Sequence, residues 1–206
     1  MPTDISQALD QISEIRRSMV RGQVFRGYRA HTTALTGVLA IVAAGLQPRI
    51  VPNPWLDLPR YLDLWCGLAV LCAAALAVQQ IVRCRRLNSP LQNERAIEAA
   101  ERFIPSLVSG AIVTIVFYKF LKPELWMLPG LWAIFFSHGI FASRGLLPRG
   151  ISGVAGYYLL AGCLDLIYAR GDHFFSPWAM GLTFGVGQLL AAAVLYWNLE
   201  RRHGRL

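Results

Sequence analysis

Residues 123–149 decide the fold, and their sequence is PELWMLPGLWAIFFSHGIFASRGLLPR. The seventeen residues from Leu125 to Phe141 include one ionisable side chain, His138, and are otherwise uncharged. A helix of that length reaches roughly 25 Å at about 1.5 Å per residue, close to the lower limit for crossing a bilayer core. Glu124 precedes this apolar run and Arg144 follows it. The stretch therefore predicts a membrane-spanning helix that carries a polar group.

Five similar runs flank this one, and the composition agrees with them. Of the 206 residues, 55% are hydrophobic and 16% are charged, whereas soluble domains are usually about 25% charged. We expect an all-α integral membrane protein whose membrane domain covers residues 30–199. Its six transmembrane helices would form three hairpins. The expected spans are residues 30–46, 62–82, 104–120, 125–141, 151–169 and 178–199.

The distribution of basic residues predicts the orientation. With both termini in the cytoplasm, fifteen of the twenty Lys and Arg residues lie on the cytoplasmic side and five on the other. Cytoplasmic loops of membrane proteins carry such an excess. We therefore expect both termini to be cytoplasmic in a multi-pass protein of the inner (plasma) membrane. The same topology accounts for the net charge of +8, so we expect no direct nucleic-acid binding.

The first 29 residues are expected to form a cytoplasmic amphipathic helix and a basic linker. Apolar residues recur at three- and four-residue steps, the spacing of one helical face. This face can lie on the membrane, pack on cytoplasmic loops or dock a partner protein. Residues 200–206 are expected to form a basic cytoplasmic tail. The residues of the apolar face are Ile5, Leu9, Ile12, Ile15 and Met19.

Two patterns of small residues predict close contacts between helices. Ala69, Ala73 and Ala77 form a stripe in the second span, and Gly181 and Gly185 form a Gly-x-x-x-Gly motif in the sixth. Small side chains let helix backbones approach closely in membranes.

We expect the protein to interact with the lipid bilayer and with a cytoplasmic protein. A second copy of this chain is an open alternative partner.

Polar residues within the spans are the candidates for ligand binding, because ionisable groups in a membrane are expensive to bury. Asp165 lies near the outer end of its span, where it can pair with Lys119, Lys122 or Arg170 or can serve a substrate or proton. His138 lies near the inner end, within reach of Tyr157 or Tyr158. A structural hydrogen bond is the alternative role for each. The complete candidate set is His138, Tyr157, Tyr158, Asp165 and Gln188.

Enzyme signatures are missing from the sequence. It contains no His-Glu-x-x-His zinc motif, no phosphate-binding loop and no serine nucleophile elbow. The four cysteines form no Cys-x-x-Cys pair. We therefore predict no catalytic residue, metal site or cofactor, and we do not expect an enzyme.

Four stretches resemble a group of uncharacterised small bacterial inner-membrane proteins. Genes of that group often adjoin a small winged-helix regulator, so the resemblance implies a signalling or regulatory partner. It implies no functional residues. The stretches are FRGYR at residues 25–29, PGLW at 129–132, YYLLAG at 157–162 and SPWAMG at 176–181.

These observations favour a membrane sensor or docking protein. It would bind an amphiphilic small molecule among its helices and a cytoplasmic, regulatory partner through the amino-terminal helix. The alternative is a small transporter or channel that uses polar groups on the fourth to sixth spans. Whether a polar path continues through the bundle would distinguish the two functions.

Overall fold

The computed structural model describes residues 30–87, 90–148, 150–169, 173 and 175–200. Within these residues the chain is helical and contains no strand. Six of its helices are long and apolar enough to cross a membrane. The expectation of an all-α chain with six helices suited to crossing a membrane is thus confirmed for the described residues. The amino-terminal segment, with its expected apolar face, lies outside the described residues.

The first five spans end close to the expected positions. The first three are α2 (Ala30–Ile50), α3 (Leu58–Leu87) and α4 (Pro90–Phe120). The fourth consists of a short 3₁₀ helix, η1 (Lys122–Met127), followed by α5 (Leu128–Ser143), and the fifth is α6 (Ile151–Tyr168). Helix α4 starts with a charged segment before the third span and passes through Pro105 without a break.

The sixth span is not a uniform α-helix. It begins as α7 (Pro177–Met180), widens into the π-helical segment η3 (Gly181–Val186), and returns to α-helix in α8 (Gly187–Leu195). A second π-helical segment, η4 (Tyr196–Glu200), ends it. Single π turns inside α-helices are rare and frequently occur at functional sites. Nothing in the apolar sequence of this span predicted them.

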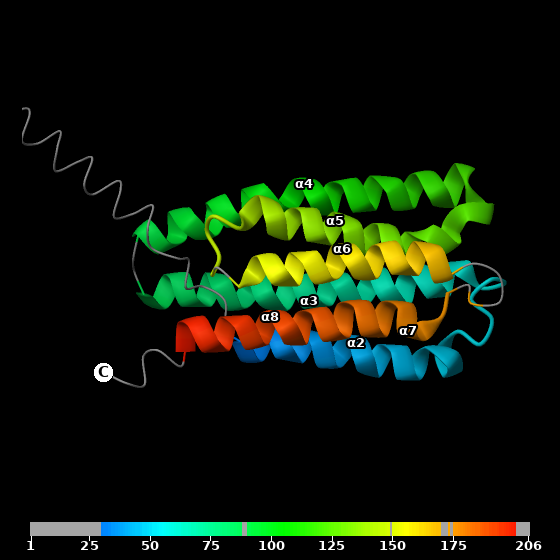
Figure 1. The fold of residues 1–206 in the computed structure, drawn as a ribbon, viewed down its shortest axis with the longest axis horizontal. Coiled ribbons are helices and arrows are strands. Elements are labelled where there is room, and N and C mark those ends of the chain that lie inside the picture. Colours follow the sequence, from blue (N-terminus) through cyan, green and yellow to red (C-terminus); the bar gives the residue numbers. More distant parts are fainter. Residues whose placement is uncertain (1–29, 88–89, 149, 170–172, 174, 201–206) are drawn as a thin grey trace, which may run out of the picture.

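The spans lie side by side along the long axis of the molecule (Figure 1). The described chain enters at Ala30 and leaves at Glu200 at the same end, which we call the proximal end. The opposite end, where α2 and α6 finish and α7 starts, is the distal end. The positive-inside pattern predicts that the proximal end is cytoplasmic.

Packing is closest between the first and last spans and between α5 and α6. Three separate hairpins are not evident. Glycines make both contacts possible, because a Cβ added at Gly130 would lie 2.7 Å from the carbonyl oxygen of Gly162. A Cβ at Gly181 would lie 2.5 Å from Cβ of Ala44, so the Gly-x-x-x-Gly face packs on α2. The packing role expected for this motif is confirmed.

The second span has few contacts with the rest of the bundle, and the third packs mainly on one neighbour, α5. In their apolar windows 11% and 6% of the residues are buried, against 50% in the fourth span, so most of their side chains face outwards. The alanine stripe of α3 is exposed, which means that its expected close contact is not made by the described chain. The distal end of α3 is the exception, since Tyr61 and Trp65 are buried there.

Candidate functional site

Asp165 lies in α6, one turn before its distal end, and is half-buried. Its Oδ2 atom accepts a hydrogen bond of 3.0 Å from the hydroxyl of Thr183. Among the described residues, no Lys, Arg or His forms an ion pair with Asp165, so the expected pairing with Lys119 or Lys122 is not made. Arg170, the third expected partner, lies outside the described residues. The carboxylate therefore has a neutral partner.

The π-helical segment η3 carries the partner groups. Thr183 is buried in the middle of this segment, facing Asp165. The preceding residue, Leu182, accepts a hydrogen bond of 2.9 Å at its carbonyl oxygen from the Tyr157 hydroxyl. Two polar side chains of α6, eight residues apart, are thus tied to adjacent residues of η3. Through these two hydrogen bonds, η3 links the last span to α6.

Tyr61 of α3 adds a buried hydroxyl to this region. The residue is completely buried, and its hydroxyl has no hydrogen-bond partner among the described residues. A buried hydroxyl without a partner costs roughly 1–3 kcal/mol. We define the distal polar cluster as Tyr157, Asp165 and Thr183, which the two hydrogen bonds of η3 bring together.

A buried, hydrogen-bonded amide joins three elements beside Tyr61 at the distal end. Gln47 of α2 accepts a hydrogen bond of 2.9 Å from the indole of Trp65 and donates one of 2.9 Å to the carbonyl oxygen of Phe175. Phe175 has a φ angle of 54°, which is rare for an aromatic residue. Its ring packs against Tyr61 with centroids 4.6 Å apart. The strained turn therefore fixes both the ring beside Tyr61 and the carbonyl that Gln47 binds.

A second polar position lies deeper in the bundle, between α6 and α8. Tyr158 is completely buried and its ring contacts those of Phe136 and Phe184. Gln188 lies beside its hydroxyl, but the two groups do not reach hydrogen-bond geometry. Gly187 makes room for the tyrosine, since a Cβ there would lie 2.4 Å from Cζ of Tyr158. Tyr158 and Gln188 are thus brought together, as neighbours of an aromatic cluster.

His138 is not part of either polar position. Its ring is exposed and Nδ1 lies 2.7 Å from the carbonyl oxygen of Ile134 on its own helix. The adjacent Ser137 is the residue that faces the bundle, and its hydroxyl donates a hydrogen bond of 2.7 Å to the carbonyl of Ala155. Of the candidates from the sequence, the structure joins Tyr157 with Asp165 through η3 and Tyr158 with Gln188. It leaves His138 apart.

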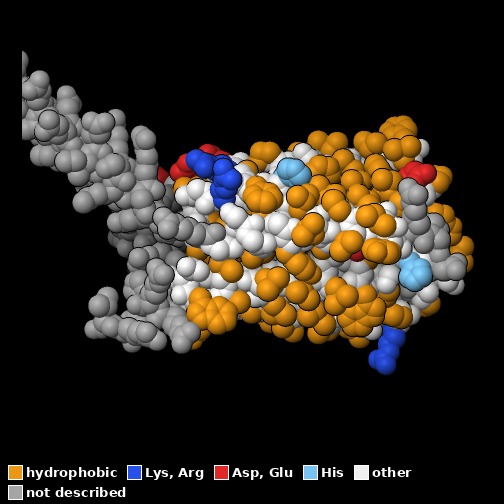
Figure 2. Space-filling model, viewed as in Figure 1, with side chains coloured by type: hydrophobic (Ala, Val, Ile, Leu, Met, Phe, Trp, Pro, Cys, Tyr) orange, Lys and Arg blue, Asp and Glu red, His pale blue; other side chains and the backbone are white. Residues whose placement is uncertain are grey.

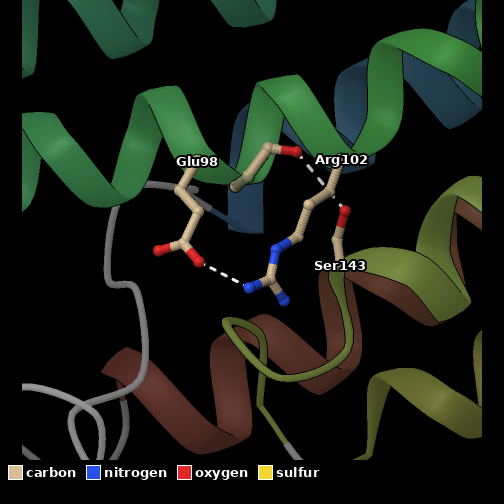
Figure 3. Close-up of polar contacts among 4 residues, drawn as sticks. Glu98, Arg102 and Ser143 are labelled. Atoms are coloured by element: carbon tan, nitrogen blue, oxygen red, sulfur yellow. Dashed lines mark hydrogen bonds and ion pairs between the residues drawn. The ribbon is translucent and has the colours of Figure 1, made fainter.

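The proximal end has polar contacts of a different kind. There Arg102 forms an ion pair with Glu98 one turn earlier on α4, and the Ser143 hydroxyl donates to the Ala99 carbonyl over 3.4 Å (Figure 3). Both members of the ion pair are partly exposed, and such pairs contribute little stability. The ion pair lies within α4, and the Ser143 hydrogen bond joins α4 to the end of α5.

The surface over the distal half is mainly apolar. Figure 2 shows hydrophobic side chains over most of the face on which α6 and the last span lie, with a small acidic patch recessed among them. Leu164 and Leu182, each next in the chain to a residue of the distal polar cluster, are half-exposed or more. The cluster is therefore bordered by the surface that would face lipid.

Sequence reasoning did not identify Gln47, Tyr61 or Thr183. In the sequence, these residues differ from their neighbours only by an amide or hydroxyl group inside an apolar span. Such groups are too common in membrane spans to identify a site. In the described part of the chain, no three His, Cys, Asp or Glu side chains gather as metal ligands. The docking residues Ile5, Leu9, Ile12, Ile15 and Met19 lie outside the described residues.

Comparison with known proteins returned no relative. No protein family, no curated protein and no solved structure matches the chain.

Proposed function

We propose that this chain is a sensor of the bacterial inner membrane that binds an amphiphilic small molecule at the distal polar cluster and reports binding to a cytoplasmic partner. One observation carries the proposal. Asp165, a carboxylate inside a membrane span, is half-buried and has a neutral hydrogen-bond partner, the Thr183 hydroxyl, with no ion-pair partner among the described residues. Ionisable groups at such positions are expensive and mark ligand or ion sites.

Sensing fits the distribution of polar groups better than transport does. Among the described residues, buried polar side-chain atoms without a hydrogen-bond partner occur on Tyr61 at the distal end, on Tyr158, and on Gln79 in the half of α3 nearer the proximal end. Closer to the proximal end, the described contact between α6 and α8 is filled by apolar residues, including Ile151, Val154 and Ala191. An ion or polar solute passing through would meet this apolar layer. This favours a ligand that enters and leaves on the distal side.

The packing of the last span on α2 offers a way to transmit a conformational change from the cluster to the proximal end. Gly185 of η3 lies against Gly37 of α2, where an added Cβ would approach the carbonyl oxygen of Gly185 to 2.8 Å. A π turn that reverts to α geometry shifts the register of the helix by one residue. Such a shift at η3 would displace α2, which begins at Ala30, directly after the expected docking segment. The resemblance to proteins encoded beside winged-helix regulators supports a regulatory partner.

The binding half of this function is tested with purified full-length protein in phosphatidylcholine nanodiscs. Amphiphiles with a dodecyl chain are added, and the melting temperature is recorded. At ten times its Kd, a ligand stabilises the folded protein by about 1.4 kcal/mol. We expect at least one head group to raise the melting temperature of the wild type, and expect the increase to shrink when Thr183 and Asp165 are replaced together by Val and Asn. No shift with any head group would contradict the proposal.

A further inference from the structure

Two arginines lie close together at the proximal end, beside the connection between α5 and α6. Arg102 of α4 points towards this connection (Figure 3), and its Nη1 atom lies 3.7 Å from where a Cβ on Gly145 would be. Gly145 directly follows Arg144. Consecutive Cα atoms are about 3.8 Å apart, so the Cα of Arg144 lies within about 9 Å of that nitrogen. The two guanidinium groups can therefore reach one small anion.

Both arginines have hydrogen-bond donors to spare. Arg102 uses Nη2 for its ion pair with Glu98, and no other acceptor among the described residues takes its remaining N–H groups. Arg144 is exposed and forms no ion pair within the described part of the chain. A guanidinium group presents its N–H donors as a planar fork that matches the oxygens of a phosphate. The two side chains together thus suit a phosphate group.

The acidic residues of α4 are the charges that oppose an anion here. Glu94, Glu98 and Glu101 recur at four- and three-residue steps, so they share one face of the helix. Phe103 contacts α5 at Gly139, and helical spacing places it on the opposite side from Glu94 and Glu101. Among the described carboxylates, Glu98 is the one that pairs with the arginine beside the turn. It neutralises one of the two guanidinium groups and leaves one positive charge uncompensated.

The position of these arginines along the spans corresponds to the level of lipid head groups. Arg102 lies near the proximal end of the third span, Ile97–Phe120, and Arg144 directly follows the fourth, Lys122–Ser143. Figure 2 shows charged side chains of both signs at this end and hydrophobic side chains over most of the remaining face. We expect this end to be cytoplasmic, and the cytoplasmic leaflet carries anionic lipids. A phosphate held here would leave its acyl chains along the apolar surface of the bundle.

We propose that Arg102 and Arg144 form a binding site for an anionic phospholipid, with its phosphodiester group between the two guanidinium groups. A phospholipid whose head group bears a single negative charge compensates the remaining positive charge of the site. A zwitterionic lipid brings a cation together with its phosphate and leaves that charge uncompensated. The inference is independent of the ligand at the distal polar cluster, which lies towards the opposite end of the bundle.

The test measures lipid binding to the delipidated full-length protein in a neutral detergent by native mass spectrometry. The probes are phosphatidylglycerol, phosphatidylethanolamine and phosphatidylcholine with the same acyl chains. We expect the dissociation constant of the first bound phosphatidylglycerol to be at least about tenfold lower than those of the other two lipids, because only the anionic lipid compensates the charge of the site. Equal dissociation constants for the three lipids would overturn the proposal.

Substitutions locate the site. Arg144→Gln removes a guanidinium group that forms no described ion pair, and it should abolish the preference for phosphatidylglycerol over phosphatidylcholine. Arg102→Gln should do the same, and Arg144 decides the matter if that variant does not fold. Arg144→Lys keeps the charge and should retain the preference. Arg60→Gln, at an exposed arginine of the distal end, is the matched control and should also retain it.

The remaining outcomes test the position of the site and the nature of its ligand. If Arg144→Gln retains the preference, anionic lipid binds elsewhere and the proposal is wrong. If Arg60→Gln loses the preference as well, binding follows the net charge of the protein and there is no site at the proximal end. Glycerol 3-phosphate in tenfold excess over the lipid should not displace it, because this anion has no acyl chains to bury. Displacement would assign the arginines to a soluble phosphate and overturn the lipid proposal.

Discussion

The side-chain amide of Gln47 donates a hydrogen bond of 2.9 Å to the carbonyl oxygen of Phe175, 128 residues later in the chain. Through its own oxygen the same amide accepts the indole N–H of Trp65. One buried glutamine thereby joins α2, α3 and the turn before α7 at the distal end. Because Phe175 packs on Tyr61, the position of the unpartnered tyrosine hydroxyl depends on this amide.

Replacing Gln47 by Met should destabilise the protein. Methionine has a similar length but offers no amide, so the buried Trp65 N–H and the Phe175 carbonyl would both lose their partner. Each buried group left unsatisfied costs about 1–3 kcal/mol. The measurement is the melting temperature of the detergent-solubilised protein. Leu46→Met, at the adjacent and lipid-facing position, is the control and should change little. Equal melting temperatures for the two variants would show that this amide does not hold the distal end.

The glycine face of the last span gives a second prediction. Gly181→Leu and Gly185→Leu should each lower the stability of the detergent-solubilised protein more than Leu189→Ala. An added Cβ would lie 2.5 Å from Ala44 at the first position and 2.5 Å from Cγ1 of Ile41 at the second. Such overpacking costs about 1–3 kcal/mol. Gly45 has open space around it, so Gly45→Leu is the matched control. Wild-type melting temperatures for both glycine variants would mean that this face is turned to lipid.

Tyr158 and Gly187 should behave as a coupled pair. Gly187→Ala places a Cβ 2.4 Å from Cζ of Tyr158 and should destabilise the protein by about 1–3 kcal/mol. Tyr158→Leu shortens the opposing side chain, so the double variant should be more stable than the sum of the two single effects predicts. Gly156→Ala is the control, since a Cβ added at Gly156 would meet nothing within 4 Å. Additive effects in the double variant would contradict the contact.

Reporter fusions test the orientation of the bundle. A reporter after Leu206 and another within residues 88–92 should both be cytoplasmic, and one at Asn53 should be periplasmic. The reason is the fifteen-to-five distribution of basic residues. The described chain enters and leaves at the same end, as an even number of spans requires (Figure 1). A periplasmic carboxyl terminus would reverse the orientation or demand an odd number of spans.

Deleting residues 2–18 tests the docking role of the amino-terminal segment. The five basic residues from Arg16 to Arg29 should hold this segment near anionic lipid, at about 1 kcal/mol per residue. The deleted protein should still insert and melt like the full chain. In paired pull-downs from native membranes, it should lose a cytoplasmic protein that the full chain retains. Recovery of the same proteins by both would mean that the apolar face is a membrane anchor and would favour the transporter function.

The number of membrane crossings, and nearly all of their positions, could be predicted from the amino-acid sequence without any neighbour. Each span is an apolar run with charged residues or prolines at its ends. Because charges and helix breaks are costly in hydrocarbon, such a run can be recognised from the local sequence alone. The sequence also identified Gly181 and Gly185 as packing positions, because two small residues four apart lie on one helix face. Asp165 stood out for the same local reason, as a charge in an apolar run.

Which polar groups share a site could be learned only from the packed bundle. His138 and Ser137 are neighbours in the chain, but one faces outwards and the other bonds to α6, since adjacent helical residues point about 100° apart. Thr183 meets Asp165, and Gln47 meets Trp65 and Phe175, across different elements because of how the spans rotate against one another. That rotation is set by contacts such as Gly37 with Gly185 and by the π turn in η3. Hydropathy indicates how deep a residue lies in the membrane, but it does not show towards which neighbour its helix face is turned. Which residues form the site is therefore decided by the packing between spans.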